Sequence, residues 1–462
     1  MTRDRHAKRL FGTDGIRGVA GHFPLDPATV ERIGRALTRS LATAGGRRPR
    51  IVVGRDTRES GPEIERALVG GIEAAGGQAD KGGVLTTPAV ACVTRLLRYD
   101  AGVVVSASHN PYRDNGLKIF SGNGQKLPDA LEAAIERCIL DEEDPGEPLQ
   151  GGADPREAAT EPADLQASYL RWLRETLPPG ASFSGLELVL DCANGAASSL
   201  GPEIFRRLGA SVTTINAAPD GRNINEACGA LHPEGLAAEV VRRRAHLGLA
   251  FDGDADRCLL IDARGSLLDG DYILYLAARD LKRAGRLPGD TVVGTVMSNL
   301  WLERALRAEG ITLLRAPVGD KYVLEEMQRG EHTLGGEQSG HIIFLETSAA
   351  GDGLLTGLLT LDLLRRTGLD LAAWAASVRP CPQVLLNVPV RSRPPLDTHP
   401  RIGPAIRDEE RRLGDRGRLL VRYSGTEPKA RIMVEGESRA LVEECASRLK
   451  RVIQTEIGQE TI

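Results

Sequence analysis

The stretch Val103-Val-Val-Ser-Ala-Ser-His-Asn-Pro111 decides the fold. Its three β-branched residues predict a buried strand, and Asn110-Pro111 closes the polar loop that follows. Open α/β sheets bind ligands at the carboxyl ends of their strands, so this loop predicts a site with two serine hydroxyls and an imidazole. Hydrogen bonds of these side chains within their own turn are the alternative. We interpret Ser108 as the covalent centre of a phosphate-transfer site.

Length and composition limit the class of protein. A chain of 462 residues is too long for one core and predicts three or four domains with a cleft between them. A net charge of -4 and 4% aromatic residues argue against a nucleic-acid partner. Seven cysteines without a C-x-x-C pair indicate neither a disulfide framework nor a zinc site. No apolar run could span a bilayer, so we expect no membrane partner and a reducing, cytoplasmic location.

A strand that opens onto a small-residue turn and a helix occurs three times in the chain. Each time a second strand follows and ends in a polar loop. The first strands begin near Val52, Leu188 and Val292, and the polar loops are Ser106–Asn110, Asp252–Arg257 and Gly335–His341. We infer three related α/β units that each present one functional loop.

The C-terminal part of the chain has a different pattern. Beyond about Ala375, short strands and two helices predict an α+β domain with paired antiparallel strands. The acidic, Gly- and Pro-rich segment 141–162 is interpreted as a linker. The predicted fold class is therefore α/β, with three similar α/β domains and a C-terminal α+β domain. The predicted domains are residues 1–155, 156–260, 261–375 and 376–462.

Three carboxylates crowd the loop Asp252-Gly-Asp-Ala-Asp-Arg257. Asp252, Asp254 and Asp256 repel one another unless a cation lies among them, and oxygen ligands suit Mg²⁺. An EF-hand is excluded, because Arg257 occupies the loop position that requires glycine. An exposed acidic turn is the alternative. Mg²⁺ would still need another anionic oxygen, which a phosphate on Ser108 would supply.

Two further loops carry groups that suit a sugar phosphate. Gly335–His341 combines a carboxylate, an amide, a hydroxyl and an imidazole, a mixture that suits a polyol, with a solvated turn as the alternative. Arg422–Pro428, with Arg431 beyond it, predicts an anion nest between two guanidinium groups, which suits a phosphate monoester. A plain hairpin with surface arginines is the alternative there. Arg17 and Lys118 complete the cationic set.

Taken together, these loops resemble the α-D-phosphohexomutase superfamily. Five motifs carry the resemblance, stand in the family's order and span nearly the whole chain. They are Phe11-Gly-Thr-Asp-Gly-Ile-Arg-Gly18, Ser106-Ala-Ser-His-Asn-Pro111, Asp252-Gly-Asp-Ala-Asp-Arg257, Gly336-Glu-Gln-Ser-Gly-His341 and Arg422-Tyr-Ser-Gly-Thr-Glu-Pro428. The first and last motifs are most similar to the branch of the family that acts on glucosamine phosphates.

The resemblance implies four domains around one site in a central cleft and a reversible shift of phosphate between O6 and O1 of glucosamine. It further implies one Mg²⁺ per active site, phosphorylation of Ser108, and a hexosamine 1,6-bisphosphate as priming intermediate. The implied metal ligands are Ser108, Asp252, Asp254 and Asp256. The residues that would handle phosphate or protons are Arg17, His109, Lys118, Arg257 and His341. The residues that would bind the substrate are Glu337, Ser339, Arg422, Ser424, Gly425, Thr426 and Arg431.

Three other functions stay open from the sequence. A phosphoglucomutase/phosphomannomutase would act on neutral hexose phosphates. A phosphatase of the aspartyl-phosphate type would use Asp252 or Asp254 as nucleophile, although the D-x-D-x-T run expected of that class is absent. A sugar-phosphate sensor would bind its ligand without isomerising it. The sequence also leaves open whether the chain forms a homodimer and which residue is the general acid or base.

Overall fold

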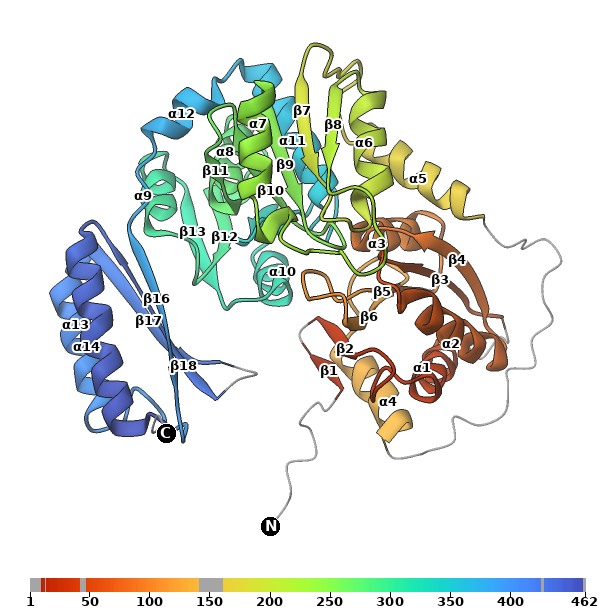
Figure 1. Cartoon of the computed structure of the whole chain (residues 1–462), viewed down its shortest axis with the longest axis horizontal. Helices are drawn as coiled ribbons and strands as arrows, with labels where there is room; N and C mark the ends of the chain where they lie inside the picture. Colours follow the sequence, from red (N-terminus) through yellow and green to blue (C-terminus); the bar gives the residue numbers. More distant parts are fainter. Residues whose placement is uncertain (1–9, 13, 42–46, 141–160, 425–427, 460–462) are drawn as a thin grey trace.

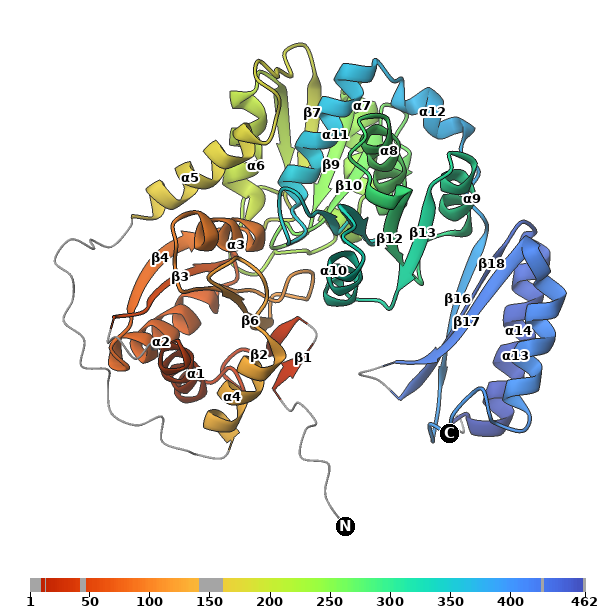
Figure 2. The same ribbon diagram turned by 180° about the vertical axis from the view of Figure 1, so that it is seen from behind.

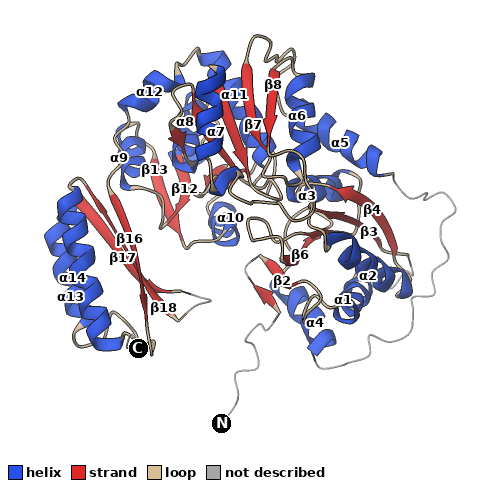
Figure 3. Cartoon of the chain, viewed as in Figure 1, coloured by secondary structure: helices blue, strands red, loops and turns tan. Residues whose placement is uncertain are grey.

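The computed structural model describes residues 10–12, 14–41, 47–140, 161–424 and 428–459. Its strands form four separate sheets, and helices accompany each of them (Figures 1 and 3). This architecture confirms the predicted fold class of mixed α/β sheets followed by an α+β domain. The predicted linker lies almost wholly outside the described residues.

The first unit is a six-stranded mixed sheet around β5, the strand that precedes Ser106. All five residues of β5 are buried, as its β-branched run predicted. Asp26 caps the first helix by accepting a hydrogen bond of 3.0 Å from the backbone N–H of Thr29. The elements are β1 (Phe11–Gly12), β2 (Gly15–Val19), α1 (Pro27–Ser40), β3 (Arg50–Arg55), α2 (Gly61–Ala74), β4 (Gln78–Val84), α3 (Thr87–Leu96), β5 (Ala101–Val105), β6 (Asp114–Ser121) and α4 (Asp129–Leu140).

The second and third units follow directly in the chain. The second contains α5 (Pro162–Glu175), β7 (Glu187–Asp191), α6 (Ala197–Arg207), β8 (Ser211–Ile215), a 3₁₀ turn (Gly229–Leu231), α7 (Glu234–Arg243), β9 (Leu247–Phe251), β10 (Cys258–Asp262) and β11 (Leu267–Leu268). The third contains α8 (Gly270–Arg283), a 3₁₀ turn (Pro288–Asp290), β12 (Thr291–Thr295), α9 (Leu300–Ala308), β13 (Thr312–Ala316), α10 (Asp320–Arg329), β14 (Leu334–Gly336), β15 (Ile342–Phe344), α11 (Gly353–Thr367) and α12 (Leu371–Ser377).

The three α/β sheets share one strand order. Their common parts are β4-β3-β5-β6, β8-β7-β9-β10 and β13-β12-β14-β15. In each sheet the first three of these strands are parallel and the fourth returns antiparallel. Each polar loop expected from the sequence is the turn from the third strand into the returning strand. The loops therefore occupy equivalent positions at the carboxyl ends of parallel strands, where α/β sheets bind ligands.

The fourth unit is a three-stranded antiparallel sheet with two helices on one face (Figure 1). Its order is β16-β18-β17. Ser438 caps the terminal helix by accepting a hydrogen bond from the Leu441 N–H. The elements are β16 (Gln383–Pro389), α13 (Ile402–Leu413), a 3₁₀ turn (Gly414–Arg416), β17 (Gly417–Tyr423), β18 (Lys429–Gly436) and α14 (Arg439–Ile457).

The hydrophobic cores show which units are joined. The largest core runs from Val90 of α3 through Leu165 of α5 and Leu249 of β9 to Leu354 of α11, so it connects the first three units. The fourth unit has a core of its own between its sheet and α14. Figures 1 and 2 both draw the fourth sheet apart from the first unit.

Two of the expected domain boundaries fall inside elements of the structure. The boundary at residue 260 lies within β10, which must return beside β9 to complete the second sheet. The boundary at residue 375 lies within α12. We therefore propose to divide the chain after β11 and after α12. Among the described residues, no helix is both long enough and apolar enough to span a membrane.

Candidate active site

Ser108 lies in the loop after β5 and is only 2% exposed. Its backbone is in the left-handed region, with φ of 52°, which a residue with a side chain adopts at a cost of about 1 kcal/mol. The hydroxyl of Ser106 supports this turn, because it accepts a hydrogen bond of 2.9 Å from the Ser108 N–H and donates one of 2.7 Å to Asp56. The loop therefore holds the Ser108 side chain in one direction.

A buried ion pair anchors the same loop from β3. Asp56 and Arg58 are fully buried, with 2.9 Å between Asp56 Oδ2 and Arg58 Nε. Arg58 Nη2 donates to the carbonyl oxygens of Ser108 and Asn110, each at 2.9 Å. Asn225, from the second unit, donates to the Ser108 carbonyl at 2.9 Å. The sequence analysis missed these three anchoring residues, and for Asp56 and Arg58 the only signal was their place at the end of a buried strand.

The hydroxyl of Ser108 reaches the acidic loop between β9 and β10. Ser108 Oγ donates to Asp252 Oδ2 at 2.6 Å and lies 3.2 Å from His109 Nδ1. Asp252, Asp254 and Asp256 are all buried, and one oxygen atom from each lies within 4.8 Å of the others. The structure therefore brings the predicted serine and the three predicted aspartates into one cluster.

Lys118 of β6 supplies positive charge to this cluster. Its Nζ lies 2.8 Å from Asp254, 3.2 Å from Asp256 and 3.2 Å from Asp14. Burial by itself would lower the pKa of Lys118, but these carboxylates raise the pKa well above its ordinary value. Burial would raise the pKa of Asp256, but Lys118, His341 and Arg257 together outweigh it and hold the pKa of Asp256 well below its ordinary value. Burial and the two neighbouring carboxylates raise the pKa of Asp252.

The acidic loop fits a hard divalent cation. Among the described residues, no hydrogen-bond donor reaches Asp254 Oδ1 or Asp256 Oδ1, although both atoms are buried. Buried carboxylate oxygens without a donor or cation are costly. Three converging carboxylates are also the ligand type that Mg²⁺ prefers. The observed donor set therefore matches the predicted metal site.

The loop between β14 and β15 joins the cluster through His341. His341 Nδ1 lies 3.6 Å from Asp256 Oδ1. Burial favours the neutral imidazole, but Asp256 outweighs it and raises the pKa of His341 to about 9. In the same loop, Ser339 Oγ donates to Glu337 at 3.4 Å, and Glu337 accepts a hydrogen bond of 3.0 Å from the Gly319 N–H. The expected sugar loop therefore lies next to the acidic loop.

The remaining predicted cations surround the Ser108 loop. Arg17 of β2 pairs with Asp14 and donates to Asn110 at 3.2 Å. Arg257 Nε lies 3.9 Å from Asp256 Oδ1. Burial, together with Arg257 and Arg17, lowers the pKa of His109 to about 4, so this imidazole is neutral at pH 7.

The fourth unit carries its two arginines on facing strands. Arg422 of β17 is directly opposite Arg431 of β18, so both side chains lie on the same face of the sheet. Ile432 packs into the core with α14, which places Arg431 on the other, helix-free face. Burial and Arg431 lower the pKa of Arg422. Ser424 is buried beside them, whereas Gly425 and Thr426 lie outside the described residues.

The structure thus brings three of the four predicted loops together. Strands β17 and β18, which carry Arg422 and Arg431, are drawn apart from the first unit in both Figure 1 and Figure 2. An acidic centre beside a buried serine hydroxyl and a separate pair of arginines can accommodate a cation and two phosphate groups. This arrangement suits phosphoryl transfer on a substrate that carries a second phosphate.

Comparison with known proteins agrees with this geometry. Four models of the phosphoglucomutase/phosphomannomutase family match the chain: alpha/beta/alpha domain I at residues 8–145, domain II at 169–265, domain III at 269–381 and the C-terminal domain at 385–452. The phosphoglucosamine mutase of Koribacter versatilis (strain Ellin345) is 49% identical over 99% of both chains.

Solved structures show the same fold. A phosphoglucomutase/phosphomannomutase family protein from Burkholderia thailandensis superposes with a TM-score of 0.78 at 25% identity, covering 97% of this chain and 99% of that one. The N-acetylphosphoglucosamine mutase of Aspergillus fumigatus, solved in complex with GlcNAc-6P and magnesium, has a TM-score of 0.67 at 20% identity, covering 98% and 97%. The chain therefore belongs to the phosphoglucomutase/phosphomannomutase family of phosphohexomutases, within its phosphoglucosamine mutase branch.

Proposed function

We propose that this enzyme interconverts glucosamine 6-phosphate and glucosamine 1-phosphate, with Ser108 carrying the phosphoryl group between turnovers. One observation supports the proposal most directly. The Ser108 hydroxyl lies 2.6 Å from Asp252, so a phosphoryl group on this oxygen would stand beside all three aspartates. The product would feed the synthesis of amino-sugar nucleotides and cell-wall precursors.

The reaction has two half-reactions that balance in atoms and charge. In the first, the bond between phosphorus and Ser108 Oγ breaks, and a bond from phosphorus to the sugar O1 forms. The proton of that hydroxyl passes to a side chain, Ser108 Oγ takes up a proton in place of the phosphoryl group, and glucosamine 1,6-bisphosphate results. In the second, Ser108 Oγ gives up this proton as it takes the phosphoryl group from O6, O6 gains a proton, and glucosamine 1-phosphate is released.

Mg²⁺ would be held by Asp252, Asp254 and Asp256 together with an oxygen of the Ser108 phosphoryl group. The bound ion would offset negative charge on the transferring group. The family match supports this choice of metal, and the buried Asp254 Oδ1, which no donor among the described residues reaches, supports a cation at this place. Arg17, Arg257 and His109 would line the same phosphoryl position, where the two guanidinium groups would bind its oxygens.

His341 is the residue we assign to proton exchange with the sugar. It belongs to the loop that presents Glu337 and Ser339, the groups expected to bind the sugar hydroxyls. It also contacts the acidic cluster through Asp256. Lys118 is less suited to lose a proton, because three carboxylates surround its ammonium group. We therefore assign Lys118 to charge balance.

The fourth unit would hold the phosphate that is not reacting. Arg422 and Arg431 present two guanidinium groups on one face of the sheet. Ser424, Gly425 and Thr426 would add hydroxyl and backbone donors at the end of the same hairpin. Because the bisphosphate must turn around between half-reactions, each phosphate would occupy this position in turn.

The enzyme is expected to work in the cytoplasm. All seven cysteines are free, and six of them are buried. Free thiols without disulfides are typical of proteins in a reducing compartment.

The decisive experiment compares three substrates. Turnover of glucosamine 6-phosphate, glucose 6-phosphate and mannose 6-phosphate is measured with Mg²⁺ and catalytic glucosamine 1,6-bisphosphate. Intact mass before and after priming reports a phosphoryl group on the protein. We expect the highest kcat/KM for the glucosamine substrate and a mass increase that Ser108→Ala abolishes. A preference for glucose or mannose phosphate would instead support the neutral-hexose enzyme.

A further inference from the structure

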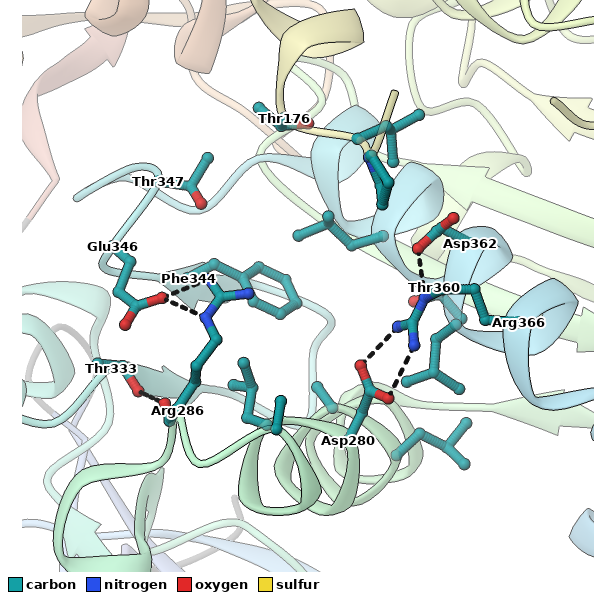
Figure 4. A pocket seen from close by; sticks show the side chains of 18 residues that line it. Thr176, Asp280, Arg286, Thr333, Phe344, Glu346, Thr347, Thr360, Asp362 and Arg366 are labelled. Atoms are coloured by element: carbon teal, nitrogen blue, oxygen red, sulfur yellow. Dashed lines mark hydrogen bonds and ion pairs between the residues drawn. The ribbon is translucent and has the colours of Figure 1, made fainter. Parts of the chain in front are cut away.

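A second cavity lies apart from the Ser108 cluster. It has a volume of about 500 Å³ and is enclosed by the end of α5, by α8, by β15 and by α11 (Figure 4). None of its lining residues belongs to the predicted active site. Its volume falls within the range of small-molecule sites, roughly 300 to 1,000 Å³. The cavity is therefore large enough for a ligand that the proposed mutase reaction does not use.

The walls of this cavity combine apolar side chains with polar and charged ones. The apolar side chains include Leu276 and Leu281 of α8, Phe344 of β15, and Leu359 and Leu363 of α11. Three different elements thus contribute hydrocarbon surface to one space. A ligand with an apolar body would gain free energy by removing this surface from water.

Two ion-paired groups lie on opposite sides of the cavity (Figure 4). On one side, Arg366 donates to Asp280 at 2.7 Å and to Asp362 at 2.7 Å. On the other side, Arg286 donates to Glu346 at 3.2 and 2.5 Å. Both guanidinium groups are therefore already bound to carboxylates of the protein.

The lining carries one more negative charge than positive charges. Its charged side chains are three carboxylates and two guanidinium groups. Asp362 is only 4% exposed, and among the described residues no hydrogen-bond donor reaches its Oδ1. Arg366 bonds its Oδ2, and Arg365 Nη2 lies 3.8 Å from its Oδ1. Glu346 pairs with Arg286 through Oε2 only. A phosphate or carboxylate ligand would meet repulsion here, whereas a cationic or N–H donor would be attracted.

We propose that this cavity is a second ligand site, which binds small amphipathic amines. The apolar or aromatic body would lie between α8, β15 and α11, and the ammonium or N–H group would face Asp362 or Glu346. The site is independent of the proposed mutase reaction, whose substrates are anionic.

The test uses two probes with the same ring and opposite charge. Tryptamine and indole-3-propionate are titrated separately into the full-length enzyme by isothermal calorimetry. We expect tryptamine to bind with a dissociation constant of about 1 mM or tighter, as ligands of this size allow. We expect indole-3-propionate to bind at least tenfold more weakly.

Two variants locate the bound probe. Ala277→Leu places extra carbon atoms in the cavity and should weaken tryptamine binding at least tenfold. Glu346→Gln removes one carboxylate from a side chain that is 41% exposed, so it should fold normally and weaken binding several-fold. Glu309→Gln is the matched control, because Glu309 also pairs with an arginine but does not line the cavity. None of the three should change the mutase rate.

Three results would overturn the proposal. The first is no saturable heat from tryptamine up to 10-fold above the expected dissociation constant. The second is equal binding of the two probes, which would contradict recognition by charge. The third is tryptamine binding that Glu346→Gln and Glu309→Gln affect equally, which would place the probe elsewhere. Because binding is measured without turnover, failure here is distinguishable from failure of the proposed mutase function.

Discussion

The Ser108 cluster places opposite charges next to each other, whereas the arginine pair of the fourth unit places like charges next to each other. In the cluster, the Lys118 ammonium is 3% exposed and has three carboxylates within 3.2 Å, so opposite charges meet before any ligand arrives. In the fourth unit, Arg422 and Arg431 stand directly opposite each other, and like charges in that position destabilise a sheet. The paired charges of the first region fix its geometry, and we expect the second region to gain stability if an anion binds there.

The largest effect should come from the cluster. Ser108→Ala removes the oxygen that would carry the phosphoryl group, so we expect mutase turnover to fall about a thousandfold or more. The protein should lose its phosphoryl mass and keep its melting temperature within a few degrees. Steady-state rates and intact mass check both points. Ser377→Ala, at an exposed serine of α12, is the matched control, and near-normal turnover of Ser108→Ala would remove Ser108 from the covalent role.

The next effect should come from the anchor beneath the serine loop. Arg58→Met leaves Asp56 as an unpaired buried charge, which should lower the free energy of unfolding by about 3 to 5 kcal/mol. Urea unfolding measures the loss, and turnover should fall as well because the Ser108 carbonyl loses a donor. Arg222→Met is the control: Arg222 pairs with Glu59 on the surface, where such pairs contribute about 1 kcal/mol or less. Equal losses in the two variants would contradict a buried anchor.

Substitution of an arginine in the fourth unit is expected to have a smaller effect, on substrate binding rather than on stability. Arg422→Met should raise KM for glucosamine 6-phosphate about tenfold to a hundredfold, because a charge-assisted hydrogen bond contributes about 1.5 to 3 kcal/mol. Stability should not fall, because the substitution removes one of two facing like charges. Arg439→Met, on the exposed start of α14, should change neither quantity. A loss of kcat as large as that of Ser108→Ala, with KM unchanged, would make the two regions equivalent.

The last prediction concerns a carboxylate near the cluster that lacks a cation. Burial raises the pKa of Asp352 to about 6, so the folded protein binds this proton more tightly than the unfolded chain. Stability from this group is therefore present at low pH and is lost as pH rises from about 4 to 6. Asp352→Asn keeps the helix cap, so it should be more stable than the parent above pH 7, by about 2 to 3 kcal/mol, and no more stable near pH 4.

Asp26 provides the matched control for this pH dependence. It also caps a helix, but hydrogen bonds from Thr29 outweigh burial and lower the pKa of Asp26. Asp26→Asn should therefore be less stable than the parent at neutral pH, the opposite sign to Asp352→Asn. Urea unfolding at several pH values measures both variants. If both Asn variants changed the free energy of unfolding in the same direction at neutral pH, burial and neighbouring hydrogen bonds would not explain the opposite pKa shifts of Asp352 and Asp26.

The sequence predicted those parts of the fold in which local pattern and environment agree. The run Val103–Val105 became the buried strand β5. The antiparallel pairs of the fourth unit were also expected, and β17 and β18 confirm them. In each case hydrophobic period, capping or turn residues specify the element within a short window.

The interior supports of the site could not be predicted in this way. Asp56, Arg58 and Asn225 are single polar residues in loops from two different units, and no local pattern distinguishes them from solvent-exposed turns. Their roles arise only when β3, β5 and the second unit come together. The Ser108 hydroxyl contacts Asp252, which lies 144 positions later in the sequence. The motifs predicted which residue types form the site, but they did not predict this hydrogen bond.

The separate core of the fourth unit has a calorimetric consequence. Among the described residues, α14 and its sheet share no hydrophobic cluster with the other units, and polar contacts such as Arg304 to Glu437 and Arg418 to the Val296 carbonyl connect them to the third unit. Heating should therefore melt the fourth unit as its own cooperative block, giving a second heat-absorption peak. A bisphosphate that contacts both the fourth unit and the other three units would bring the two melting temperatures closer together. Calorimetry would therefore show whether the ligand joins the two blocks.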